Sequence, residues 1–168
     1  MYANQVHTMK FEHLIEINDL SNPMILPMTR EQLWNGLVLR AEYPKLFIPH
    51  LDSCDITSRQ LDSLTRTLQF GELKINDRIQ FDFLNTVVFQ VPAQGDISES
   101  TMRMVIEEPE PGALLVRFIY KDGHSAEQDL QDAVYDDFRR SAYVEADIDT
   151  IKLLRDMHAI GRLDNLLT

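Results

Sequence analysis

The sequence predicts an α+β domain in which a curved antiparallel sheet packs against one long C-terminal helix. Two observations carry this fold class. Apolar and polar residues alternate from about Cys54 to Lys121 and are interrupted only by short turns, a pattern typical of an antiparallel meander. From about Ser125 to Leu163 the spacing becomes helical, with no Gly or Pro before Gly161.

Length and composition fit one folded domain. The chain has 168 residues, of which 44% are apolar and 26% are charged, enough to build a substantial core. We expect a flexible N-terminal segment over residues 1–8 and a single domain over 9–165. The 16 basic residues against 27 acidic ones give a formal net charge of −11. Because the basic residues are not clustered, we expect no nucleic-acid partner and no binding to an anionic membrane surface.

The sequence also indicates where the protein resides. Its longest apolar run is Ala113–Val116, far short of the roughly 20 residues that a membrane-spanning helix needs, so we expect no membrane insertion. The first residues lack the apolar stretch of a secretory signal, and the single Cys54 cannot form an internal disulfide. A cytoplasmic protein is therefore the default expectation.

The first two elements are a strand and a helix. The predicted strand covers Met9 to Asn18, and its inward face holds Phe11, His13, Ile15 and Ile17. A capping box from Thr29 to Gln32 begins the helix. Pro44 ends it, and Leu46 to Pro49 follows as a short helical turn or a buried connector.

The strands that follow each turn one face inward. One inward face consists of Leu64, Arg66, Leu68 and Phe70. The longest strand candidate places on its inward face Ile79, Phe81, Phe83, Asn85 and Val87. The last two inward faces consist of Met102, Met104 and Ile106, and of Leu114, Val116, Phe118 and Tyr120. A turn is expected at Asp122-Gly123.

The C-terminal helix has one apolar stripe. A capping box at Ser125 is expected to begin it, and the stripe consists of Tyr143, Ala146, Thr150, Leu154, Met157 and Gly161. Charged residues such as Glu145, Lys152 and Asp156 face away. Because several residues of the stripe are small, the helix and the sheet cannot meet fully, which favours a cavity between them. A completely filled core is the alternative.

Several local motifs, in this order, resemble one protein family. They are Thr29-Arg-Glu-Gln-Leu-Trp-Asn-Gly-Leu37, Arg66-Thr-Leu-Gln-Phe-Gly71, Phe118-Ile-Tyr120 and the segment from Tyr143 to Arg155. From about Met9 to Leu163 the chain resembles the AtaL-like family of the SRPBCC, or START-like helix-grip, superfamily. The resemblance implies about seven strands around a C-terminal helix and a hydrophobic cavity, with one or two short helices after the first strand.

The resemblance implies little about chemistry. The superfamily includes lipid carriers, hormone receptors, aromatase/cyclases and members without known activity. The AtaL-like branch takes its name from a fungal secondary-metabolite cluster, which directs attention to secondary metabolism.

We therefore predict that the domain binds a small, mainly hydrophobic molecule with an anionic or carbonyl group. The candidate ligand-binding residues are Arg66, Phe70, Phe83, Asn85, Met104, Phe118, Tyr120, Tyr143, Thr150, Leu154 and Met157. Arg66 carries a permanent charge on an apolar face, so it must contact the ligand or pair with an internal acid such as Asp147 or Glu42.

Two other hypotheses stay open. The first is an enzyme, a cyclase or dehydratase acting on a polyketide-like or aromatic metabolite, in which Arg66 polarises a carbonyl and Tyr120, Tyr143 or His13 moves a proton. The second is a homodimer formed through a sheet edge. No residue is assigned as catalytic, and the His and Cys spacing and the lack of a Gly-rich loop lead us to expect no metal and no cofactor. For His13, a satisfied core position is the alternative to a general base.

Overall fold

The computed structural model describes residues 6–125 and 129–165. It contains one seven-stranded antiparallel sheet with the order β1-β7-β6-β5-β4-β3-β2. The strands are β1 (Val6–Glu16), β2 (Ser53–Arg59), β3 (Ser63–Phe70), β4 (Leu73–Asp82), β5 (Thr86–Val91), β6 (Ser100–Glu107) and β7 (Leu115–Ser125). The helices are α1 (Arg30–Glu42), the 3₁₀ turn η1 (Pro44–Leu46) and α2 (Asp129–Ala159). The predicted fold class is confirmed.

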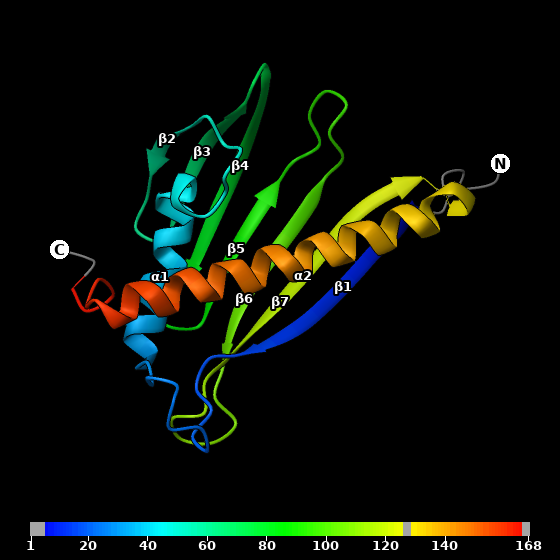
Figure 1. Ribbon diagram of the computed structural model, residues 1–168. Helices are drawn as coiled ribbons and strands as arrows, with labels where there is room; N and C mark the ends of the chain where they lie inside the picture. Colours follow the sequence, from blue (N-terminus) through cyan, green and yellow to red (C-terminus); the bar gives the residue numbers. More distant parts are fainter. Residues whose placement is uncertain (1–5, 126–128, 166–168) are drawn as a thin grey trace.

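One long helix covers the sheet. Figure 1 shows α2 running across β5, β6 and β7, with α1 near the C-terminal end of α2. The strand alternation places Ile79, Met104 and Phe118 in the core between sheet and helices, where each is fully buried. β2 to β7 form a meander, and β7 returns to pair with β1, so the seven strands form one continuous sheet with a broad face for α2.

The predicted orientation of α2 is confirmed. Thr150, Leu154 and Met157 are buried and Tyr143 is half-buried, whereas the charged residues expected to face away are exposed. Two positions of the stripe differ from the prediction. Ala146 is exposed, and Gly161 follows the end of the helix with a φ of +78°, a conformation that glycine adopts readily.

The strand predicted over residues 79–87 is two strands. β4 ends at Asp82 and β5 begins at Thr86, and these residues pair with each other across a tight turn. Leu84 has a φ of 63°, and Phe83 is 71% exposed. The alternation of residue types continues by chance through the turn, so periodicity alone concealed the reversal.

The end of β7 also differs from the prediction. The turn expected at Asp122-Gly123 is absent, because β7 continues to Ser125 and pairs there with Val6 of β1. β1 accordingly begins at Val6, before the expected start at Met9. The capping box expected from Ser125 depends on residues 126–128, which lie outside the described residues.

α1 forms as predicted and packs closely on α2. The Thr29 side chain accepts a hydrogen bond from the Gln32 N–H, Gln32 reciprocates, and Pro44 follows the helix end. At the crossing of the helices, a Cβ on Gly36 would lie 2.7 Å from Cδ2 of the fully buried Leu154. The absence of a side chain at Gly36 therefore lets the two helices approach.

Gly36→Ala should destabilise the protein because the added methyl group collides with Leu154. Overpacking of this kind costs about 1–3 kcal/mol, which exceeds the gain of about 1 kcal/mol in helix propensity. Urea unfolding measures the loss, and the same substitution in a Leu154→Val background should cost less. Equal losses in both backgrounds would show that the collision is not the cause.

Candidate functional site

A buried polar cluster lies between the sheet and α2. Its side chains come from three elements, His13 on β1, Tyr120 on β7 and Asp147 on α2. Strand pairing sets Phe11 opposite Tyr120 and His13 opposite Phe118, so His13 and Tyr120 share the inward face. Asp147 is one helical turn from both Tyr143 and Thr150, on the stripe that faces the sheet.

The Asp147 carboxylate connects the side chains of the cluster. The Tyr120 hydroxyl donates to it at 2.7 Å from each carboxylate oxygen, and Nε2 of His13 lies 2.7 Å from Oδ2. The Asp147 side chain is 0% exposed, and that of His13 is 16% exposed. A carboxylate without water requires such partners, and residues 134 positions apart in the sequence supply them here.

Burial shifts the protonation equilibria of this cluster. Burial raises the pKa of Asp147, while the hydrogen bonds from Tyr120 and His13 oppose that rise. Burial, and next the negative charge of Asp147, raise the pKa of Tyr120 well above its ordinary value. The phenol therefore keeps its proton and acts as a hydrogen-bond donor.

Aromatic rings surround the cluster. Tyr143 stacks on Tyr120 with ring centroids 4.0 Å apart and planes 5° from parallel. His13 stacks on Phe118 at 5.3 Å and on Phe11 at 5.5 Å. These contacts fix the orientation of the imidazole and the phenol. Tyr120 and Tyr143 also line a pocket of about 160 Å³, together with residues of β5, β6 and β7.

Arg40, which is half-buried, brings a positive charge to the same region. Its Nε atom is buried and has no hydrogen-bond partner among the described residues. The guanidinium carbon lies 5.9 Å from the ring centroid of Phe89, a residue that also lines the 160 Å³ pocket. Burial lowers the pKa of Arg40, and electrostatic interactions with Tyr120 and Asp147 oppose this shift. A guanidinium in this position is suited to receive an oxygen acceptor.

Arg66, by contrast, is held by the protein itself. Its Nε donates to Asp77 at 2.9 Å, its Nη2 donates to the other carboxylate oxygen, and its Nη1 donates to the Ala41 carbonyl at 2.7 Å. The pairing acid is neither Asp147 nor Glu42, since Glu42 binds Arg59. Asp77 stands directly opposite Arg66 in the β3–β4 hairpin, so a register prediction across the turn at Gly71 could have found it.

The other predicted site residues occupy several places. Met104, Phe118, Thr150, Leu154 and Met157 are buried in the core, and Phe70 is half-buried near the end of β3. Phe83 lines a separate pocket beside α1. Of the candidate ligand-binding residues, Tyr120 and Tyr143 thus lie at the polar cluster, together with His13, which the sequence analysis considered as a general base or a core histidine. Sequence reasoning missed Arg40, because a charged residue on a helix carries no sequence signal of burial. It considered Asp147 as a partner of Arg66, whereas the structure pairs Asp147 with Tyr120 and His13.

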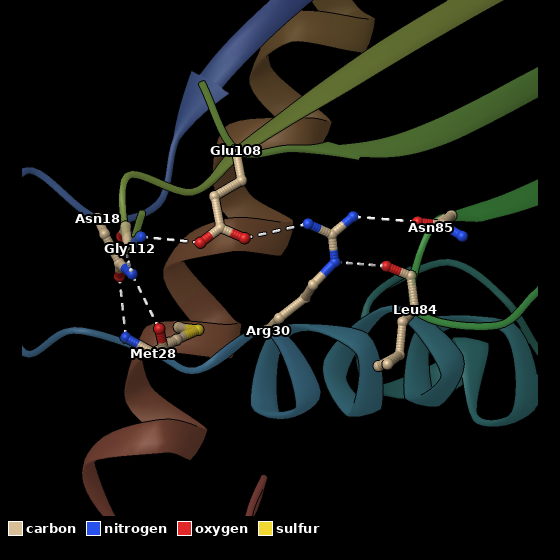
Figure 2. A network of polar contacts seen from close by, with 7 residues as sticks. All are labelled: Asn18, Met28, Arg30, Leu84, Asn85, Glu108 and Gly112. Carbon is tan, nitrogen blue, oxygen red and sulfur yellow. Dashed lines mark hydrogen bonds and ion pairs between the residues drawn. The ribbon is translucent and has the colours of Figure 1, made fainter. Parts of the chain in front are cut away.

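Asn85 belongs to a different network, at the end of the sheet (Figure 2). Arg30 donates to the Leu84 carbonyl at 2.9 Å, to Asn85 at 3.1 Å and to Glu108 at 3.1 Å. Glu108 in turn accepts a bond from the Gly112 N–H at 2.8 Å. These contacts hold the start of α1 against the β4–β5 and β6–β7 turns. Asn85 therefore stabilises loops and does not reach Tyr120.

Comparison with known proteins supports the fold and the family. A family described as acetylaranotin biosynthesis cluster protein L, AtaL, matches residues 15–161. Among curated proteins, none matches the sequence significantly. No helix in the described part of the chain is long and apolar enough to cross a membrane.

Solved structures share the architecture at low identity. The di-domain ARO/CYC BexL has a TM-score of 0.65 and 14% identity, over 89% of this chain and 49% of BexL, so the chain spans about half of that protein. The Streptomyces aromatase/cyclase Zhui has a TM-score of 0.61 and 13% identity over 91% and 96%. A Thalictrum flavum norcoclaurine synthase mutant has a TM-score of 0.67 and 10% identity over 92% and 98%. At such identities the likeness concerns the fold.

Arg66→Met should lower the stability of the protein, because Asp77 is then left buried without its cation. We expect a loss of about 3–5 kcal/mol in the free energy of unfolding. The double variant Arg66→Met/Asp77→Leu replaces the pair by apolar side chains and should recover most of this loss. Urea unfolding measures both. A loss below about 1 kcal/mol in the single variant, the value of an exposed ion pair, would contradict the assignment.

Proposed function

The chain belongs to the AtaL family, and from that premise we propose that it binds a small, mainly hydrophobic molecule with an anionic or carbonyl oxygen. The ligand would occupy the space between the sheet and α2. The observation that carries this proposal is Arg40, whose buried Nε has no partner among the described residues. A buried N–H donor is costly unless an acceptor meets it, and a ligand oxygen would supply that acceptor.

The surroundings of Arg40 favour a flat, apolar ligand body. Three of the nine residues that line the adjoining pocket are aromatic, namely Phe89, Tyr120 and Tyr143, so rings form part of its wall. Its volume of about 160 Å³ is below the roughly 300 Å³ at which ordinary small-molecule sites begin. The pocket therefore suits one or two fused rings, or the end of a larger molecule. Arg66 is not needed as the anchor, because Asp77 already engages it.

A second candidate function, acid–base catalysis of the cyclase or dehydratase type, is favoured by the cluster at Asp147. When Asp147 is ionised, Nε2–H of His13 donates to it and Nδ1 of the imidazole is left as a proton acceptor. Removal of a proton next to a ligand carbonyl would place the negative charge on the carbonyl oxygen, where Arg40 could stabilise it. The aromatase/cyclases that share the fold make this reaction class a reasonable one to test.

Arg40→Met tests the binding proposal. The wild type should bind 2-naphthoate more tightly than neutral 2-naphthylmethanol in isothermal titration calorimetry. The variant should lose about 1.5–3 kcal/mol for the carboxylate, a factor of roughly ten to 150, and much less for the alcohol. Arg103→Met removes an exposed arginine of β6 and should change neither affinity. Equal losses for both ligands in the Arg40 variant, or none, would overturn the proposal.

Proton exchange tests the catalytic alternative. The methyl protons of 2-acetylnaphthalene lie next to a carbonyl and exchange slowly with D₂O, which NMR follows directly. If His13 acts as a base, wild-type protein should accelerate the exchange by about 10²–10⁴-fold, and His13→Gln should abolish the acceleration while the ketone still binds. Equal exchange rates with the wild type and with the His13→Gln variant would contradict catalysis by His13 and favour a binding function alone.

A further inference from the structure

A second pocket lies on the other side of α1. It has a volume of about 540 Å³ and is formed by α1, the β2–β3 turn and the end of β4. Its lining residues, which define the Trp34 pocket, are Trp34, Val38, Glu42, Arg59, Gln60, Leu61, Asp62, Ser63, Leu64, Phe81, Asp82 and Phe83. The volume falls within the range of ordinary small-molecule sites, roughly 300–1,000 Å³.

The Trp34 pocket is separate from the site at Tyr120. Trp34, Val38 and Glu42 recur every four residues and share one face of α1. Gly36 and Arg40 lie on another face, where Gly36 meets Leu154 of α2. The helix therefore stands between the two pockets.

Aromatic rings form one wall of the Trp34 pocket. The indole of Trp34 meets Phe81 edge-on at 6.3 Å and Phe83 edge-on at 5.9 Å between centroids. Trp34 is 4% exposed. Phe83, at the outer end of the wall, is 71% exposed. The wall thus runs from the core to the surface and offers ring faces and edges to a ligand.

The charges around the pocket are mostly negative. Three acidic side chains and one basic side chain line it. Glu42 and Arg59 neutralise each other at 2.7 Å. The carboxylates of Asp62 and Asp82 form no ion pair within the described part of the chain and stand on exposed residues. The pocket therefore combines an aromatic wall with two uncompensated negative charges.

From this combination we propose that the Trp34 pocket is a second binding site, for an organic ammonium compound with an aromatic or bulky apolar body. An ammonium group is attracted both by ring faces, of which Trp is the strongest, and by the carboxylates of Asp62 and Asp82. The apolar body replaces water against Val38 and Leu64. The same carboxylates would repel an anionic ligand, so the site discriminates between ligands by their charge.

The chain has a single tryptophan, so its fluorescence reports on this pocket alone. Benzyltriethylammonium should change Trp34 emission saturably, and added salt should weaken the binding. The anion 3-phenylpropionate, of similar apolar size, should leave the emission unchanged. Calorimetry run in parallel should give the same affinity for the cation as the fluorescence titration does.

Asp62→Asn/Asp82→Asn removes the two free charges without altering size and should weaken benzyltriethylammonium binding about three- to tenfold, the sum of two exposed ion pairs. The matched control is Asp96→Asn/Glu99→Gln in the β5–β6 loop, which removes the same charge away from the pocket and should bind like the wild type. The proposal is overturned by an emission change equal for cation and anion, by an unaltered affinity in the pocket variant, or by calorimetric binding that leaves Trp34 emission constant.

Discussion

The hydrogen bonding of the buried Asp147 is the constraint that organises the region between the sheet and α2. A carboxylate inside a core is tolerated only where donors meet it, and Tyr120 and His13 meet it from two adjacent strands. This requirement fixes the rotation of α2 about its axis at that point. It also fixes which side chains of β1 and β7 face the helix, and it holds Tyr143 stacked on Tyr120.

Two arginines near Phe89, the buried Arg66 and the half-buried Arg40, differ in the partners of their guanidinium groups. The guanidinium carbons of Arg66 and Arg40 lie 5.3 Å and 5.9 Å from the same ring centroid. Arg66 is engaged by Asp77 and by the Ala41 carbonyl, so its charge is compensated within the protein. Arg40 has a buried Nε without such a partner. The proposed ligand contact of Arg40 depends on this difference between the two guanidinium groups.

α1 has two roles in this arrangement. On one face, Gly36 lets α2 approach through Leu154, and Arg40 reaches the region of the polar cluster. On another face, Trp34 and Val38 form the wall of a separate pocket. The Arg30 network at the start of the helix ties it to the turns at the end of the sheet (Figure 2). A single short helix thus positions side chains for two distinct environments.

The sequence by itself determined the fold class, most strand faces, the bounds of α1 and most of the buried stripe of α2, because periodicity and capping are local properties of the chain. It could not reveal the turn at Leu84, where the alternation of residue types continues through a reversal, or the continuation of β7 past Asp122, which depends on pairing with β1.

The tertiary structure alone decided the partners of the buried charges. Asp147 meets His13 from a strand 134 residues away, and Arg66 pairs with Asp77 rather than with either acid that the sequence suggested. Which charges pair depends on how separate elements are packed against one another, and the spacing of residues along one strand or helix carries no information about that packing.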